Sequence, residues 1–285
     1  MKQQYKGIIL IIASAFFFSL MSLFVKLSGD LPAIQKSFFR NFIAAIFATV
    51  ILVRSGQGFS FQKKNLPFLI LRSVFGTLGI LCNFYAVDHL VLSDASMLNK
   101  MSPFFVILCS IIFLREKTRS FQIGAVIAAF AGSLFIIRPT FSNMEFIPSL
   151  IGLLGGFGAG AAYTAVRYLG KRGERGPFVV FFFSAFSCLF CLPFMIADYA
   201  PMTVQQLVML LLAGLAAAGG QFTITAAYFY APASEISIYD YTQIIFSTLW
   251  SLLIFSQVPD MLSIAGYIII CAAAVVNFIL ARRTC

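Results

Sequence analysis

Four charged residues lie inside long apolar segments of this sequence: Arg40, Arg72, Lys100 and Asp240. A charge at the centre of a membrane helix costs roughly 2.5–3.5 kcal/mol on insertion scales, so such residues often bind a solute or pair with each other. Counting inward from the segment ends places Arg40 and Lys100 in the outer third of a membrane, and Arg72 and Asp240 in the inner third. Long basic side chains can also reach the interface from such depths, so for Arg40 and Arg72 the sequence leaves both interpretations open.

Lys100 has the sequence context of a cavity residue. Asn99 precedes it, and Ser102-Pro103 follow closely. Proline has no N–H and its ring displaces a carbonyl of the preceding turn, which frees backbone groups to line a cavity. A role in binding is therefore favoured for Lys100.

Among the long apolar segments of the sequence, the one at 235–256 contains the most polar residues. These residues recur at helical spacing and would form a broad arc on one side of a helix. Such an arc should face protein or water, although interhelical hydrogen bonding is an alternative use for it. Aromatic walls with a few polar anchors suit small amphiphilic solutes. The predicted substrate-binding residues are Lys100, Asn99, Asn83, Tyr85, Tyr163, Gln221, Thr225, Tyr239, Asp240 and Gln243.

Other reactive residues lack the partners that their chemistry requires. Cys188 and Cys191 form a C-x-x-C without nearby His or acidic ligands, and the sole histidine, His89, belongs to no H-E-x-x-H motif. The glycine runs at 155–160 and 214–220 lack the preceding strand and following Lys-Ser/Thr of a phosphate loop. We therefore predict no catalytic residues, no metal and no cofactor.

The elements that position these residues are membrane helices. The 285-residue chain is 60% hydrophobic and only 11% charged, with a mean hydropathy of +0.95, whereas soluble domains are about a quarter charged. A bilayer core of about 30 Å requires roughly 20 apolar residues. Ten such segments are predicted, at 7–28, 33–53, 66–87, 94–114, 119–138, 148–169, 176–197, 203–228, 235–256 and 260–281.

The net charge of +10 is explained by topology rather than by a nucleic-acid partner. With the N-terminus inside, most of the 20 lysines and arginines fall at the two chain ends and in the loops at 54–65, 115–119 and 170–176. This positive-inside bias predicts a multi-pass protein of the inner, cytoplasmic membrane with both termini cytoplasmic.

The sequence also contains a weak internal repeat. Ser93-Asp94 matches Ser234-Glu235 and Asn99 matches Asp240, both at an offset of 141. This divides the chain into repeats at 1–140 and 141–285, each with five predicted helices. Because five is odd, the second repeat must enter the membrane from the opposite side, and inverted repeats are typical of secondary transporters.

Several motifs resemble the EamA-type members of the drug/metabolite transporter superfamily. They include Ser102-Pro103-Phe104-Phe105 and the run Phe113 to Lys117 in the first half, and Ala161 to Thr164 and Phe255 to Asp260 in the second. The resemblance implies ten helices around a central cavity and, commonly, export of amino acids or other small metabolites. Where the family usually has a second Glu, corresponding to Glu116, this chain has Gln257.

The expected function is therefore secondary transport, with a small-molecule substrate, a lipid bilayer, and a coupling proton or counter-substrate as partners. A translocase of a lipid or lipid head-group precursor on the same fold is the alternative. We expect Lys100→Ala to lower transport at least tenfold with near-normal expression. Asp94 and Glu235, at equivalent positions of the two repeats, are predicted gating residues, although capping of a helix N-terminus would also explain an acidic residue there.

Overall fold

A computed structural model describes residues 2–283 except 57, 115–119, 138–144 and 231–236. All regular elements in these described ranges are helices. In chain order they are α1 (Lys2–Leu27), α2 (Ala33–Arg54), the short 3-10 helix η1 (Lys63–Asn65), α3 (Leu66–His89), α4 (Leu92–Asn99), α5 (Ser102–Leu114), α6 (Ser120–Ile137), α7 (Phe146–Lys171), α8 (Gly176–Ala197), α9 (Val204–Tyr230), the 3-10 helix η2 (Ser237–Tyr241), α11 (Thr242–Phe255) and α12 (Met261–Arg283).

Eight helical segments are long and apolar enough to cross a membrane. They contain 18 to 27 residues each and correspond to α1, α2, η1 with α3, α6, α7, α8, α9 and α12. The expected all-helical membrane fold is therefore confirmed at this level.

The two remaining predicted segments, at 94–114 and 235–256, are not continuous helices. The first divides into α4 and α5 at Lys100, because Pro103 provides no N–H to the preceding turn and fits the first turn of a new helix. In the second, the 3-10 helix η2 precedes α11. Residues 92–98 of α4 are all buried, so the irregular backbone lies within protein, as a membrane requires.

The helices pack in pairs drawn from the two halves of the chain. α1 packs along α9 and α7 along α3, while α2 packs against α8 and α6 against α12. Glycines allow close approach: a Cβ added at Gly158 of α7 would lie 2.8 Å from the Cα of Gly79 in α3. The glycine runs therefore serve helix crossings.

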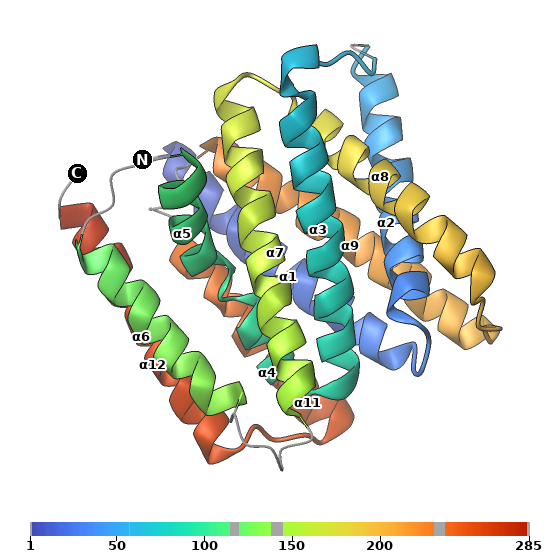
Figure 1. Cartoon of the computed structure of the whole chain (residues 1–285). Coiled ribbons are helices and arrows are strands. Elements are labelled where there is room, and N and C mark those ends of the chain that lie inside the picture. The colour runs from blue at the N-terminus through green and yellow to red at the C-terminus, as the bar shows by residue number, and fades with distance from the viewer. Residues whose placement is uncertain (1, 57, 115–119, 138–144, 231–236, 284–285) are drawn as a thin grey trace.

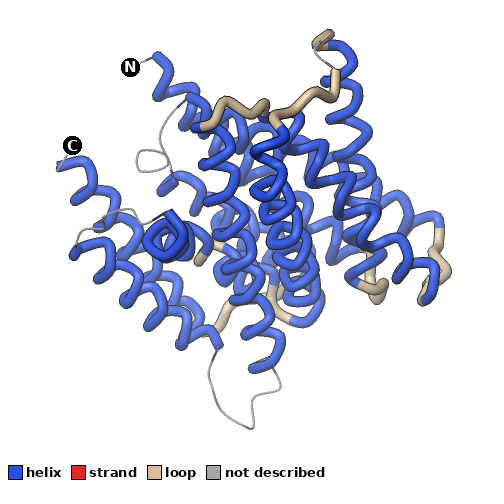
Figure 2. The backbone as a smooth tube through the Cα atoms, turned by 45° about the horizontal axis from the view of Figure 1, so that its top comes forward, coloured by secondary structure: helices blue, strands red, loops and turns tan. Residues whose placement is uncertain are grey.

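Both ends of the chain lie toward the same end of the bundle. Figure 1 shows that α1 begins there and α12 ends there, and Figure 2 shows the same arrangement from a second direction. The turn between α7 and α8 also lies toward that end. The bundle thus has a terminal end and an opposite end.

Candidate functional site

A cavity of about 70 Å³ lies where the break between α4 and α5 meets the surrounding helices. Side chains from α1, α2, α3, α7, α8, α9 and α11 surround the break between α4 and α5. The lining residues are Phe18, Met21, Arg40, Arg72, Gly76, Gly79, Ile80, Asn83, Asn99, Lys100, Ala159, Ala162, Tyr163, Phe183, Gln221 and Gln243. The structure thus brings together six of the ten residues predicted to bind substrate: Asn83, Asn99, Lys100, Tyr163, Gln221 and Gln243.

The break between α4 and α5 and the 3-10 helix η2 each contribute one member of a buried ion pair. The Nζ of Lys100, which caps the C-terminus of α4, lies 2.6 Å from Oδ2 of Asp240 in η2. Both side chains are 5% exposed, and Oδ1 of Asp240 has no hydrogen-bond partner among the described residues. Ser96 donates to Oγ of Ser247 at 2.8 Å and further joins α4 to α11.

The ion pair corrects the depths expected from sequence. Counting placed Lys100 in the outer third and Asp240 in the inner third of the membrane. Because their charged groups touch, these groups share one depth. The counting failed because it assumed a constant rise of 1.5 Å per residue, whereas the chain turns at Lys100 and adopts 3-10 geometry at Asp240.

Two arginines approach the same cavity from α2 and α3. Arg40 and Arg72 are 2% and 3% exposed, and their guanidinium carbons lie 5.5 Å and 3.9 Å from the ring centroid of Phe183 in α8. Burial at this level excludes snorkelling, which would keep the charged heads in water. A charge within an apolar segment marked both arginines in the sequence, but nothing there indicated that they converge on one aromatic ring.

Asn41 helps to hold Arg40 in place. An Nη atom of Arg40 donates to Oδ1 of Asn41, and the amide nitrogen of Asn41 donates to Oγ of Ser187 at 2.8 Å. Neither arginine has a carboxylate within 4.0 Å among the described residues, and Nε of each lacks a hydrogen-bond partner. Their positive charges therefore lie uncompensated beside the cavity.

The other predicted binding residues lie outside the cavity lining. Tyr85 stacks on His89 at 4.1 Å between ring centroids, near the end of α3. Thr225 donates to the carbonyl of Gln221 at 2.7 Å, and Tyr239 packs edge-on against Phe278. Asp240 is not in the lining itself, but its carboxylate contacts the lining residue Lys100.

The end of the bundle opposite the termini is tied by several polar contacts. Tyr267 donates to Oδ1 of the predicted gating residue Asp94 at 2.6 Å, and Lys36 pairs with Asp88 at 2.6 Å. Lys26 donates to Oε1 of Gln257 at 3.1 Å. A neutral amide therefore accepts this hydrogen bond at the position where the family usually has a Glu. The second predicted gating residue, Glu235, lies outside the described residues.

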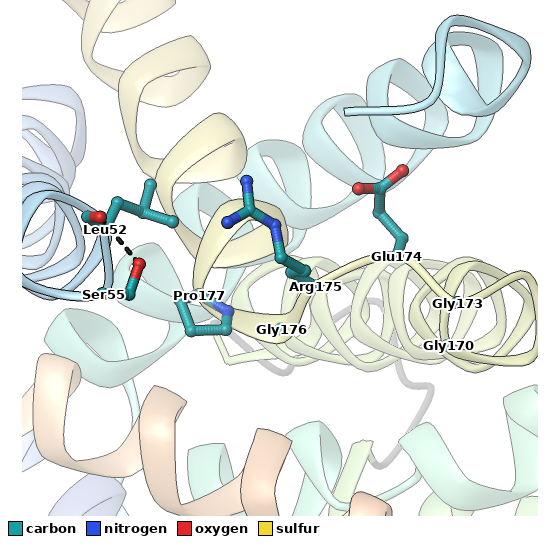
Figure 3. A pocket seen from close by; sticks show the side chains of 8 residues that line it. All are labelled: Leu52, Ser55, Gly170, Gly173, Glu174, Arg175, Gly176 and Pro177. Atoms are coloured by element: carbon teal, nitrogen blue, oxygen red, sulfur yellow. Dashed lines mark hydrogen bonds between the residues drawn. The ribbon is translucent and has the colours of Figure 1, made fainter. Parts of the chain in front are cut away.

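A larger hollow of about 420 Å³ lies near the turn between α7 and α8, lined by Leu52, Ser55, Gly170, Gly173, Glu174, Arg175, Gly176 and Pro177 (Figure 3). Its two charged residues already have partners. Glu174 accepts from Nδ2 of Asn65 at 2.9 Å, and Arg175 donates to the carbonyl of Ser60 at 2.7 Å. In Figure 3 both side chains extend from the turn in the same direction. These contacts join the two loops at the terminal end and make the hollow a poor binding site.

A helical membrane bundle with a buried polar centre is the architecture of a membrane transporter. The chain belongs to the EamA-like transporter family, which it matches over residues 5–138 and again over residues 147–279. It is similar to the pseudopaline exporter CntI of Pseudomonas aeruginosa, with 34% identity over 271 residues that cover 94% of each chain.

Similarity also extends to more distant relatives. Solute carrier family 35 member G1 of Mus musculus is 29% identical over 279 residues, which cover 91% of this chain and 74% of the relative. A solved crystal structure superposes with a TM-score of 0.71 over 98% of both chains at 15% sequence identity. That likeness concerns the fold alone.

Proposed function

We propose that this chain is a secondary transporter that exports a small metabolite, such as an amino acid or a related amphiphilic solute, by alternating access around the central cavity. The observation that carries the proposal is the buried Lys100–Asp240 pair, where the break between α4 and α5 meets the 3-10 helix η2. Discontinuous helices with charged groups near mid-membrane are typical of the substrate sites of secondary transporters. Similarity to an exporter supports the direction.

The proposed architecture has ten spans. Eight are continuous, and the other two are α4 with α5 and η2 with α11. The repeats at 1–140 and 141–285 are supported by the two family matches and by the packing pattern. When each helix is replaced by its counterpart in the other half, the α1–α9 contact becomes the α7–α3 contact and the α5–α7 contact becomes the α11–α1 contact. The α2–α8 and α6–α12 contacts each map onto themselves. A two-fold axis relating inverted repeats explains this pattern.

Alternating access requires that contacts at the two ends of the bundle break in turn. At the end opposite the termini these are Tyr267–Asp94 and Lys36–Asp88; at the terminal end Glu174 holds Asn65. Rocking of one repeat against the other would open the central cavity to each side of the membrane in turn.

The Lys100–Asp240 pair is also the best candidate for coupling to a proton or counter-substrate. A solute group that binds Lys100 competes with Asp240, and the released carboxylate, whose Oδ1 already lacks a partner, becomes a proton acceptor. Orientation in the inner membrane with cytoplasmic termini is supported by the basic residues near the terminal end, including Arg54, Lys171 and Arg175.

Counterflow in proteoliposomes tests the proposal directly. Vesicles loaded with a bacterial metabolite extract should accumulate radiolabelled solutes from the same extract, and Asp240→Asn should reduce this uptake at least tenfold. Asp198→Asn provides a matched control because Asp198 is an exposed residue after α8. Absence of counterflow with every metabolite pool would refute the proposal. Movement of labelled lipid instead would favour a lipid translocase.

A further inference from the structure

The central cavity carries more positive charge than its described residues compensate. Arg40, Arg72 and Lys100 line it, whereas Asp240 is the only carboxylate that the described residues bring within salt-bridge distance of any of them. Three cations and one anion leave two positive charges. In the low dielectric of a membrane protein, such charges are costly and are normally paired.

The same chain pairs another buried cation. Lys36 on α2 is fully buried and lies 2.6 Å from Oδ1 of Asp88. Arg40 lies one turn further along α2, yet it has no such carboxylate, and Arg72 has no hydrogen bond to any described residue. The uncompensated charge is therefore local to the cavity.

The surroundings of the two arginines hold them in position without neutralising them. The ring face of Phe183 attracts both guanidinium groups, although it carries no net charge. Gly76 makes room for Arg72, because a Cβ at this position would collide with Nη1 of the arginine and with the Phe183 ring. A guanidinium fork held in this way matches a carboxylate bidentately.

We propose that Arg40 and Arg72 bind the substrate, and that the substrate is a small organic acid carrying two carboxylates. This inference rests on the proposed transport function and names its substrate class. One carboxylate is held between the two arginines over Phe183, and the second makes up the charge balance of the cavity. Asn83, Gln221 and Gln243 supply amide groups along the same lining for the rest of the molecule.

The first test uses charge-sorted metabolites. A radiolabelled bacterial metabolite extract is separated by ion exchange into cationic, neutral and acidic fractions, and each fraction is offered to proteoliposomes in counterflow. We expect uptake from the acidic fraction, with the transported species carrying two carboxylates. Arg72→Gln should weaken uptake at least tenfold, equivalent to about 1.4 kcal/mol, and Arg72→Lys should retain an intermediate activity. Arg54→Gln is the matched control, because Arg54 is exposed at the end of the helix that carries Arg40.

The second test separates binding from a structural role. Because an uncompensated buried charge destabilises the ligand-free protein, purified Arg72→Gln should melt at the same temperature as the parent or higher. Lys36→Gln should melt lower, since it leaves Asp88 without its partner. A lower melting temperature for Arg72→Gln would make the arginine a structural element and overturn the inference.

The transport outcomes distinguish the two proposals. Uptake of only neutral or cationic solutes, or unchanged acid uptake by Arg72→Gln, would overturn the substrate class and leave the transporter assignment standing. No counterflow from any fraction would overturn both.

Discussion

Removal of the Lys100 charge should destabilise the protein as well as disable it. In Lys100→Met the stem volume is nearly preserved, but Asp240 remains a buried carboxylate with neither oxygen partnered, since Oδ1 already lacks a hydrogen bond and Oδ2 loses the contact at 2.6 Å. Removing one partner of a buried pair typically costs about 3–5 kcal/mol. At about 1.4 kcal/mol per tenfold, the unfolded fraction should rise more than a hundredfold.

The double variant Lys100→Met with Asp240→Asn separates stability from function. Neutralising both members removes the unpaired charge, and such replacements are often close to neutral in stability. We therefore expect the double variant to recover most of the lost stability, measured by denaturant or thermal unfolding in detergent, and to remain at least tenfold impaired in counterflow.

Two results would refute this reasoning. Equal stability of the single and double variants would mean that the pair is not coupled, and full transport by the double variant would make the pair purely structural. The sequence alone led us to expect near-normal expression of Lys100→Ala. The ion pair changes that expectation to a reduced yield.

Other predictions concern packing, gating and topology. Gly158→Ala should lower the free energy of unfolding by about 1–3 kcal/mol through overpacking, because the added Cβ would lie 2.8 Å from the opposing backbone of α3. Gly170→Ala in the same helix should be tolerated, since nothing lies within 4 Å of the added Cβ. Equal melting temperatures of the two variants would contradict the close crossing of α7 and α3. Asp94→Asn weakens and Tyr267→Phe removes the 2.6 Å hydrogen bond between these two residues, so both should raise labelling of cysteines introduced at the outer end. Unchanged labelling would leave Asp94 only a capping role. Reporters fused at the C-terminus or inserted in the loop at 54–65 should report a cytoplasmic location, and an external C-terminus would exclude the inverted repeat.

Most of the helix ranges could be predicted from the sequence because the need to bury backbone polar groups in lipid acts locally. Any run of about 20 apolar residues must be helical there, and eight of the ten predicted segments are continuous helices with ends within a few residues of prediction. The interruption of the helix at Lys100 was indicated in the sequence by Pro103. The 3-10 helix at Asp240 had no comparable signal, since the 3-10 helix itself contains no proline or glycine.

The binding-site predictions could indicate which residues avoid lipid, but could not show which of them contact the cavity. Polar residues facing away from lipid were recognisable by residue type, but a polar residue in a membrane helix satisfies the same requirement whether it contacts a cavity or a neighbouring backbone. Thr225 illustrates the second case, because its hydroxyl bonds the carbonyl one turn before it. Periodicity cannot distinguish these uses.

The sequence by itself determined that the chain is a helical membrane protein and that its charges within apolar segments require partners, because hydrophobicity and charge are properties of each segment alone. Tertiary structure decided which charges become partners. Lys100 and Asp240 are 140 residues apart and meet only when the two halves pack, whereas Arg40 and Arg72 meet on Phe183 without a carboxylate partner among the described residues. The physical reason is that compensation of a buried charge acts over a few ångströms, and only the packing of the helices brings groups so distant in sequence within that range.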